Sequence, residues 1–144
     1  MRVILVALFC LVATTLTFAQ GSVRVTNQAG YPPGVAPLTA SNTGTTGSTA
    51  ATLAAVAGRT NWICGFVITS GATSSAAVGN ATVAGTISGT MNFTYVDVSS
   101  GQGLLGVAFP QCIPASAVNT AIVVTAPAGG TGTVVAVTAW GFLQ

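Results

Sequence analysis

Side chains able to carry chemistry are scarce in this chain of 144 residues. Arg2, Arg24, Arg59 and Asp97 hold every side-chain charge, and histidine, lysine and glutamate are absent. Acid–base catalysis needs titratable groups held close together, and the single carboxylate has no second one to work with. Without histidine, neither a Ser-His-Asp nor a Cys-His arrangement can be built. The composition therefore argues against an enzyme.

The same scarcity argues against two kinds of binding. A zinc or iron site needs more cysteine, histidine or carboxylate ligands than this chain contains, so we expect no metal and no cofactor. The formal net charge of +2 comes from scattered arginines. It is not the clustered basic patch that binds a phosphate backbone, so we expect no nucleic acid partner.

Arg59 and Asp97 are the two residues that could form an ion pair. One interpretation is a surface pair, or two separately solvated groups, worth about 0–1 kcal/mol. The other is a pair between subunits that fixes the register of an oligomer. The sequence leaves both open.

Cys64 and Cys112 are the cysteines that follow the N-terminal segment, which itself contains Cys10. Two thiols in an exported chain suggest one disulfide. They are 48 positions apart, so closure could stabilise the fold by up to ~4 kcal/mol on the chain-entropy model. The alternative is that both are small buried apolar residues.

Trp62 and Trp140 are the two tryptophans, and each has two interpretations. Either they belong to the hydrophobic core with the phenylalanines, or one of them forms an aromatic platform that contacts a sugar. Saccharide sites usually add charged or amide side chains to fix hydroxyl groups, and this chain has few. The composition favours the core.

The first 19 residues resemble a secretory leader. Arg2 is followed by an apolar run from Val3 to Ala13, and Thr17-Phe18-Ala19 precedes Gln20. One positive charge, an apolar run and a small residue before the junction are typical of a signal peptide cleaved after Ala19. The run is shorter than the ~20 residues that span a bilayer. The alternative is a retained hydrophobic N-terminus.

The remaining residues predict strands to position these side chains. Short β-branched runs separated by Gly, Pro and Ser are typical of an all-β sandwich or barrel. We predict an antiparallel β-sandwich that is jelly-roll-like. The distribution of apolar runs and of turn residues predicts three regions: a leader over 1–19, a Pro/Gly/Thr-rich arm over 20–49 and the sandwich over 50–144.

Two predicted strands carry most of the aromatic residues. Residues 61–70 alternate, which predicts that Trp62, Cys64, Phe66 and Ile68 share an inward face. Residues 133–142 alternate as well, with one face made of Val134, Ala136, Thr138, Trp140 and Phe142, and the other of Val135, Val137 and Ala139.

Three stretches carry a resemblance to known proteins. They are Tyr31-Pro-Pro-Gly34 with 39–46, then 54–66 (AAVAGRTNWICGF), then 109–124 (FPQCIPASAVNTAIVV) with Ala139-Trp-Gly-Phe142. Together they resemble small all-β proteins of tailed-phage and prophage virion gene clusters. That resemblance implies a capsid decoration or fibre component, often a trimeric jelly roll. Its motifs are structural and carry no catalytic residues over.

Two functions are compatible with these observations. The first is a virion structural protein that forms a homo-oligomer, with a trimer favoured, and packs against capsid or other virion proteins. The second is an exported surface or matrix module that binds carbohydrate. The corresponding locations are the virion and the extracellular space, and the leader-like segment suggests export. A surface with so few charges favours self-association in both cases.

Overall fold

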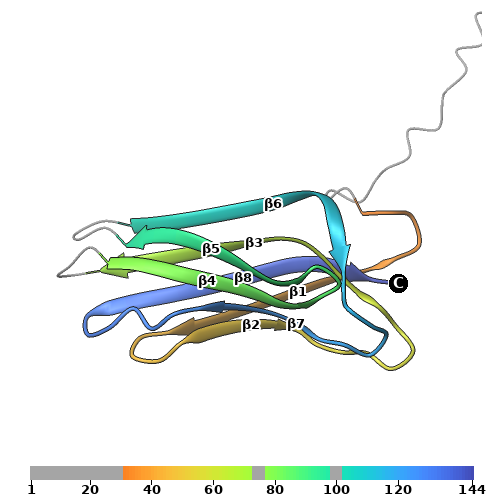
Figure 1. Ribbon diagram of the computed structural model, residues 1–144, viewed down its shortest axis with the longest axis horizontal. Coiled ribbons are helices and arrows are strands. Elements are labelled where there is room, and N and C mark those ends of the chain that lie inside the picture. Colours follow the sequence, from red (N-terminus) through yellow and green to blue (C-terminus); the bar gives the residue numbers. More distant parts are fainter. Residues whose placement is uncertain (1–30, 73–76, 98–101) are drawn as a thin grey trace, which may run out of the picture.

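The computed structural model describes residues 31–72, 77–97 and 102–144. The predicted leader over 1–19 and the first part of the predicted arm lie outside them. The described chain forms eight strands, shown in Figure 1. They are β1 (Ala36–Gly44), β2 (Thr49–Leu53), β3 (Asn61–Ala72), β4 (Ala77–Thr86), β5 (Gly89–Asp97), β6 (Gln102–Pro114), β7 (Ile122–Ala126) and β8 (Thr133–Leu143).

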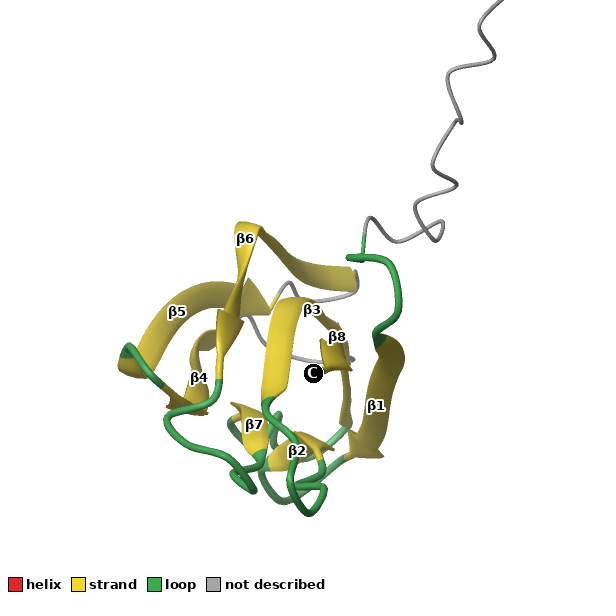
Figure 2. Cartoon of the chain, turned by 90° about the vertical axis from the view of Figure 1, so that its right-hand side faces the viewer, coloured by secondary structure: helices red, strands yellow, loops and turns green. Residues whose placement is uncertain are grey.

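The strands pair into two four-stranded antiparallel sheets that face each other (Figure 2). Sheet A has the order β1-β8-β3-β6 and sheet B the order β2-β7-β4-β5. Strand β1 thus pairs with β8, β2 with β7, β3 with β6 and β4 with β5. One long hairpin of eight strands gives this pairing when it is rolled into two layers, which is the jelly roll. The predicted β-sandwich is confirmed.

The space between the sheets is filled by medium-sized aliphatic side chains and by a cluster of three phenylalanine rings. Phe66 of β3 is fully buried and packs edge-on against Phe93 of β5, with ring centroids 5.1 Å apart. Phe109 of β6 lies beside both rings. The rest of the core comes from β3 and four other strands, in residues that are at most 1% exposed: Ala51, Leu53, Ile63, Ile68, Ala81, Val83, Ile122, Val124, Ala126, Val135, Val137 and Ala139.

Strand β8 shows why this sequence forms a sheet with one face in the core. Val135, Val137 and Ala139 are fully buried, while Ala136 and Thr138 between them are half-buried. Successive side chains of a strand point to opposite faces, so a repeat of two residues separates the core face from the outer face. The predicted division of β8 into two faces agrees with this pattern.

The predicted boundary of the sandwich at residue 50 was wrong. Strand β1 lies inside the segment expected to be an arm, and it pairs with β8 along nine register positions from Ala36 to Gly44. Its residues are mostly Thr, Ser, Asn and Ala, which looked like a turn-rich segment. At the edge of a sheet such residues need only one partner strand, so weak β propensity suffices.

Candidate functional site

The outer face of sheet A carries a second hydrophobic cluster, separate from the core between the sheets. Trp62 of β3 stacks on Phe142 of β8, with ring centroids 5.6 Å apart and ring planes 10° from parallel. Tyr31, which precedes β1, packs edge-on against Phe142 at 5.7 Å. Val35, Trp140 and the two cysteines complete this outer aromatic cluster.

A β-bulge at Cys64 puts Trp62 on this outer face. The register of β3 shifts between Ile63 and Gly65 against both of its neighbours, and against β8 Cys64 is one extra residue, because Ile63 pairs with Gly141 and Gly65 with Trp140. A bulge of one residue reverses the alternation, and Ile63 and Phe66 are therefore both buried in the core. The prediction that Trp62, Cys64, Phe66 and Ile68 share one face was wrong for this reason. The placement of Trp62 in the core was also wrong.

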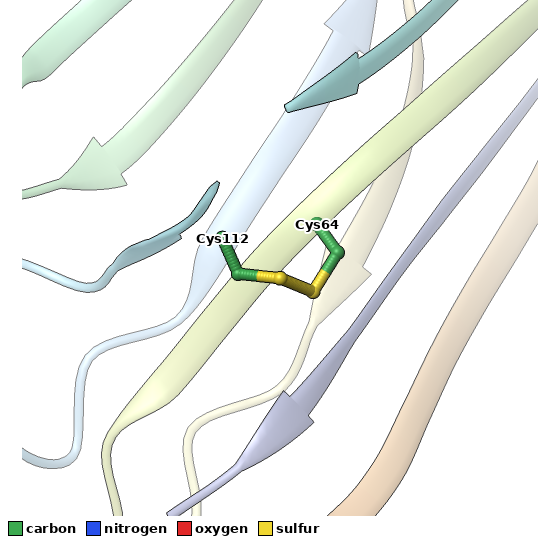
Figure 3. Close-up of a disulfide and its surroundings, with 2 residues drawn as sticks. All are labelled: Cys64 and Cys112. Carbon is green, nitrogen blue, oxygen red and sulfur yellow. A yellow bond between two sulfur atoms is a disulfide. The ribbon is translucent and has the colours of Figure 1, made fainter. Parts of the chain in front are cut away.

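The disulfide lies at the same irregularity (Figure 3). Cys64 and Cys112 are bonded, with their Cα atoms 4.1 Å apart. The register pairs Ile63 with Ile113 and Gly65 with Ala108, so residues 109–112 of β6 stand opposite Cys64 alone. The ladder has no pairs across this step, and the covalent bond joins the two strands there. Of the two sequence interpretations, the structure contains the disulfide.

Trp140 reaches across the sheet because its neighbour on β3 has no side chain. Gly65 is the register partner of Trp140. A Cβ atom on Gly65 would overlap the indole ring of Trp140 and the carbonyl oxygen of Val107. Glycine at this position therefore lets the indole cover the strand, a role that the alternation of 61–70 did not reveal. Trp140 faces outward, so the interpretation of this residue as core was wrong as well.

A groove of about 390 Å³ opens beside the cluster. Its wall is aromatic and proline-rich, with one amide and the disulfide: Pro32, Trp62, Pro110, Gln111, Cys112 and Phe142. None of these residues is charged, and none can act as an acid, a base or a nucleophile while the disulfide is intact. Such a groove can hold an apolar ring or the apolar face of a sugar, with Gln111 as the hydrogen-bonding side chain.

Two polar groups of the cluster are affected by burial. Burial raises the pKa of the Tyr31 phenol above its ordinary value of 10.0, because the charged phenolate is disfavoured away from water. The indole N–H of Trp62 is buried and has no hydrogen-bond acceptor among the described residues. A buried donor left without an acceptor costs about 1–3 kcal/mol.

Arg59 and Asp97 lie at opposite ends of the sandwich. Arg59 is on the loop between β2 and β3, where its carbonyl oxygen accepts a hydrogen bond from the N–H of Asn119. Asp97 is the last residue of β5 and is paired with Ala77. The structure describes its backbone but not its side chain. The first residue of β5, Gly89, lies at the end that holds Arg59, and the rise of the strand places Asp97 about 26 Å from Gly89. This separation excludes a pair within one molecule, whereas two separately solvated groups and a pair between subunits stay predictions.

Among the described side chains, the outer faces of both sheets carry no charge. Arg59 is the one charged residue whose side chain the structure describes, and it lies on a loop. Sheet B presents Asn and Thr side chains outward, and Asn80 donates a hydrogen bond to Asn92 at 3.4 Å. On sheet A, Val67 and Thr138 are register partners at the centre of the outer face. These faces offer hydrogen bonds and apolar contact without ions.

The described residues contain no group of three or more His, Cys, Asp or Glu side chains placed to hold a metal. Within the same ranges, no helix is long and apolar enough to cross a membrane.

Comparison with known proteins gives no further guidance. No protein-family model, no curated protein sequence and no solved structure matches the chain. Functional inference therefore depends on the chain itself.

Proposed function

We propose that the protein is a non-enzymatic structural protein of a virion, a decoration, capsid-associated or fibre component that acts as a homo-oligomer. The observation that carries this proposal is the surface: a jelly roll whose two broad outer faces lack charged side chains among the described residues. The resemblance of 31–34 with 39–46, of 54–66 and of 109–124 with 139–142 to proteins of phage virion gene clusters supports the same role.

Contact between uncharged surfaces of this kind costs little desolvation. Burying an ion requires stripping its water, whereas Thr, Ser, Asn, Ala and Val side chains lose far less on leaving water. Charged residues spread over a surface also keep soluble monomers apart, and here they amount to 3% of the chain. The sheet edges add a second drive, because the chain has no lysine to block strand pairing. A closed ring, with three copies favoured, buries such surfaces without open-ended growth.

Two measurements test the proposal. Light scattering on the purified protein at micromolar concentration should give a mass of several subunits, with a trimer expected. Mass spectrometry of virus particles from the source strain, digested with chymotrypsin because the chain has three basic residues, should detect the protein at stoichiometric level. A monomer at every concentration contradicts self-association, and its absence from particles contradicts the virion role.

The groove supports a second candidate function, an exported surface module that binds carbohydrate. Trp62 and Phe142 present aromatic surface there, and Gln111 supplies an amide. Trp62→Ala should abolish retention on a glycan array, while Trp140→Ala provides the matched control because Trp140 lies in the same cluster but does not line the groove. Absence of glycan binding by the native protein, or equal loss in both variants, contradicts this candidate.

A further inference from the structure

The outer face of sheet A forms one uncharged patch beside the outer aromatic cluster. It consists of alternate residues of the four strands, from Thr39 to Thr43 on β1, from Val134 to Trp140 on β8, from Gly65 to Gly71 on β3 and from Leu104 to Ala108 on β6. We call this patch the sheet A face. Leu104 is 69% exposed and Val134 48%. Apolar side chains exposed within one patch mark an interaction surface more often than scattered ones do.

Large and small side chains run in opposite directions along β8 and β6 on this face. The central row of register partners consists of Ser41, Thr138, Val67 and Gly106. In the next row toward the outer aromatic cluster, β8 carries Trp140 and β6 carries Ala108. In the next row away from that cluster, β8 carries Ala136 and β6 carries Leu104. The large residue of β8 therefore lies near the cluster, and the large residue of β6 lies far from it.

This order of sizes makes the sheet A face complementary to itself. A two-fold axis that crosses the strands at the central row places the two flanking rows of one copy on the opposite rows of a second copy. Trp140 then faces the row with Ala136 on the partner strand β8. Leu104 faces Ala108 on the partner strand β6. Sheets that pack face to face fill the space between them in this way, with a large side chain against a small one.

The two ends of the face fit the same axis. The outer aromatic cluster stands above the face at one end, because Tyr31 packs on Phe142, which already points away from the core. The other end is low, because a Cβ atom on Gly71 would meet nothing within 4 Å. Thr138 is the middle residue of β8, so the axis at its row brings Phe142 of one copy opposite Val134 of the other. Each cluster then lies over the low end of the partner, whereas an axis along the strands would press the two clusters together.

The area is sufficient for a specific contact. From Val134 to Phe142, β8 rises about 27 Å, and four strands about 4.8 Å apart give a width of about 19 Å. Each copy thus offers about 500 Å², so a pair buries about 1,000 Å², the lower bound for a specific interface. No described side chain of this face carries a charge whose water would have to be removed.

We propose that the sheet A face packs on the sheet A face of a second copy, about a two-fold axis that crosses the strands at the row of Thr138. The partner is a second copy because the large and small side chains match this face itself. The inference rests on the self-association proposed above and adds its surface and its symmetry. A two-fold contact joins copies in pairs, so together with the proposed ring of three it places two rings face to face.

Charges at the axis test the proposal, with sedimentation velocity on the full chain as the readout. Each Thr138 lies opposite Thr138 of the partner, so Thr138→Asp and Thr138→Lys each oppose like charges. Each should raise the dissociation constant of the pair by about tenfold or more, so that the assembly has half the native mass at micromolar concentration. An equimolar mixture of T138D and T138K should restore the native mass, and native mass spectrometry should show both chains in one complex.

Matched substitutions on the other sheet are the controls. Thr82 is half-buried like Thr138 and lies on the outer face of sheet B, between the buried residues Ala81 and Val83. Thr82→Asp and Thr82→Lys should leave the mass unchanged. Circular dichroism should show native strand content in all four variants.

A second pair of variants uses side chains whose exposure makes misfolding a minor concern. Leu104→Glu, at a 69% exposed site on the sheet A face, should weaken pairing. Ile87→Glu, at a 66% exposed site in the turn between β4 and β5, should not. If the native protein assembles but T138D, T138K and L104E keep its mass, or the Thr82 variants weaken assembly equally, docking through the sheet A face is wrong while self-association stands. If T138D and T138K fail to pair with each other, the two-fold axis at Thr138 is wrong. If the native protein stays a monomer at every concentration, the proposed self-association itself is wrong.

Discussion

The two hydrophobic clusters of this protein lie on opposite sides of strand β3 and are built differently. The core between the sheets consists of side chains from nearly every strand that alternate regularly and are almost fully buried. The outer aromatic cluster depends on a bulge, a glycine and a disulfide within a few residues of one another. Regular alternation suffices for the first, whereas the second requires departures from it.

This difference predicts how each cluster responds to change. Removing volume from the core should destabilise the whole fold, because both sheets use the same contacts. Disturbing the outer cluster should act mainly on the region near Cys64. The protein offers a convenient probe, since both of its tryptophans, Trp62 and Trp140, belong to the outer cluster. Tryptophan fluorescence therefore reports on the outer cluster and far-ultraviolet circular dichroism on the sheets.

The largest effect is expected for Phe66→Ala. Phe66 is fully buried between Phe93 and Phe109, and its truncation leaves a cavity that both sheets border. The free energy of unfolding should fall by about 3–5 kcal/mol. In urea, fluorescence and circular dichroism should change together, as in a two-state transition. Val78→Ala, at an exposed site, is the control and should cost less than about 0.5 kcal/mol. A loss below 1 kcal/mol for Phe66→Ala would show that this ring is not part of the core.

Removal of the disulfide should rank next. The double variant C64A/C112A opens a bond that spans 48 positions, and on the chain-entropy model the loss of stability is about 2–4 kcal/mol. Because the bond bridges a step where the β3–β6 ladder has no pairs, the fluorescence transition should move to lower urea than the circular dichroism transition. Coincident transitions would mean that the outer cluster and the sheets unfold as one unit. Reduction of the native protein with dithiothreitol should reproduce the variant.

The sequence predicted the sandwich and the faces of β8, because both follow from the alternation of apolar residues and from the Gly, Pro and Ser residues that separate the strands. It did not predict the position of Trp62, since one inserted residue at Cys64 leaves the pattern of apolar residues in 61–70 unchanged. It also missed β1, whose Thr, Ser and Asn residues resemble a loop in composition. The separation of Arg59 from Asp97 depends on which end of each strand meets which loop, and that is a property of topology. Local patterns therefore predicted most of the strands, while β1, the register and the strand ends required the structure.

A smaller effect is expected for Gly65→Ala, which tests how closely Trp140 packs on strand β3. The new methyl group would press on the Trp140 indole and on the backbone at Val107, so stability should fall by about 1–3 kcal/mol. Gly71→Ala, also on β3, is the matched control because a Cβ atom there meets nothing within 4 Å. Calorimetric melting of both variants measures the difference. Equal stability of the two variants would rule out close packing of Trp140 over Gly65.

The smallest effect at neutral pH is expected for Tyr31→Phe. This variant tests the outer aromatic cluster through the pH dependence of stability. Burial raises the pKa of Tyr31 in the folded protein above 10.0, whereas the unfolded chain has the ordinary value. Above pH 10 the unfolded state therefore binds fewer protons than the native state, and the free energy of unfolding falls as the pH rises. Below pH 10 this contribution is fully present. The phenylalanine variant lacks the titrating group, so its stability should decline less between pH 9 and pH 11 (about one unit on either side of that value). Tyr95 is common to both proteins and cancels in the comparison. Urea unfolding at several pH values gives the two curves, and parallel curves would show that ionisation of Tyr31 does not oppose folding.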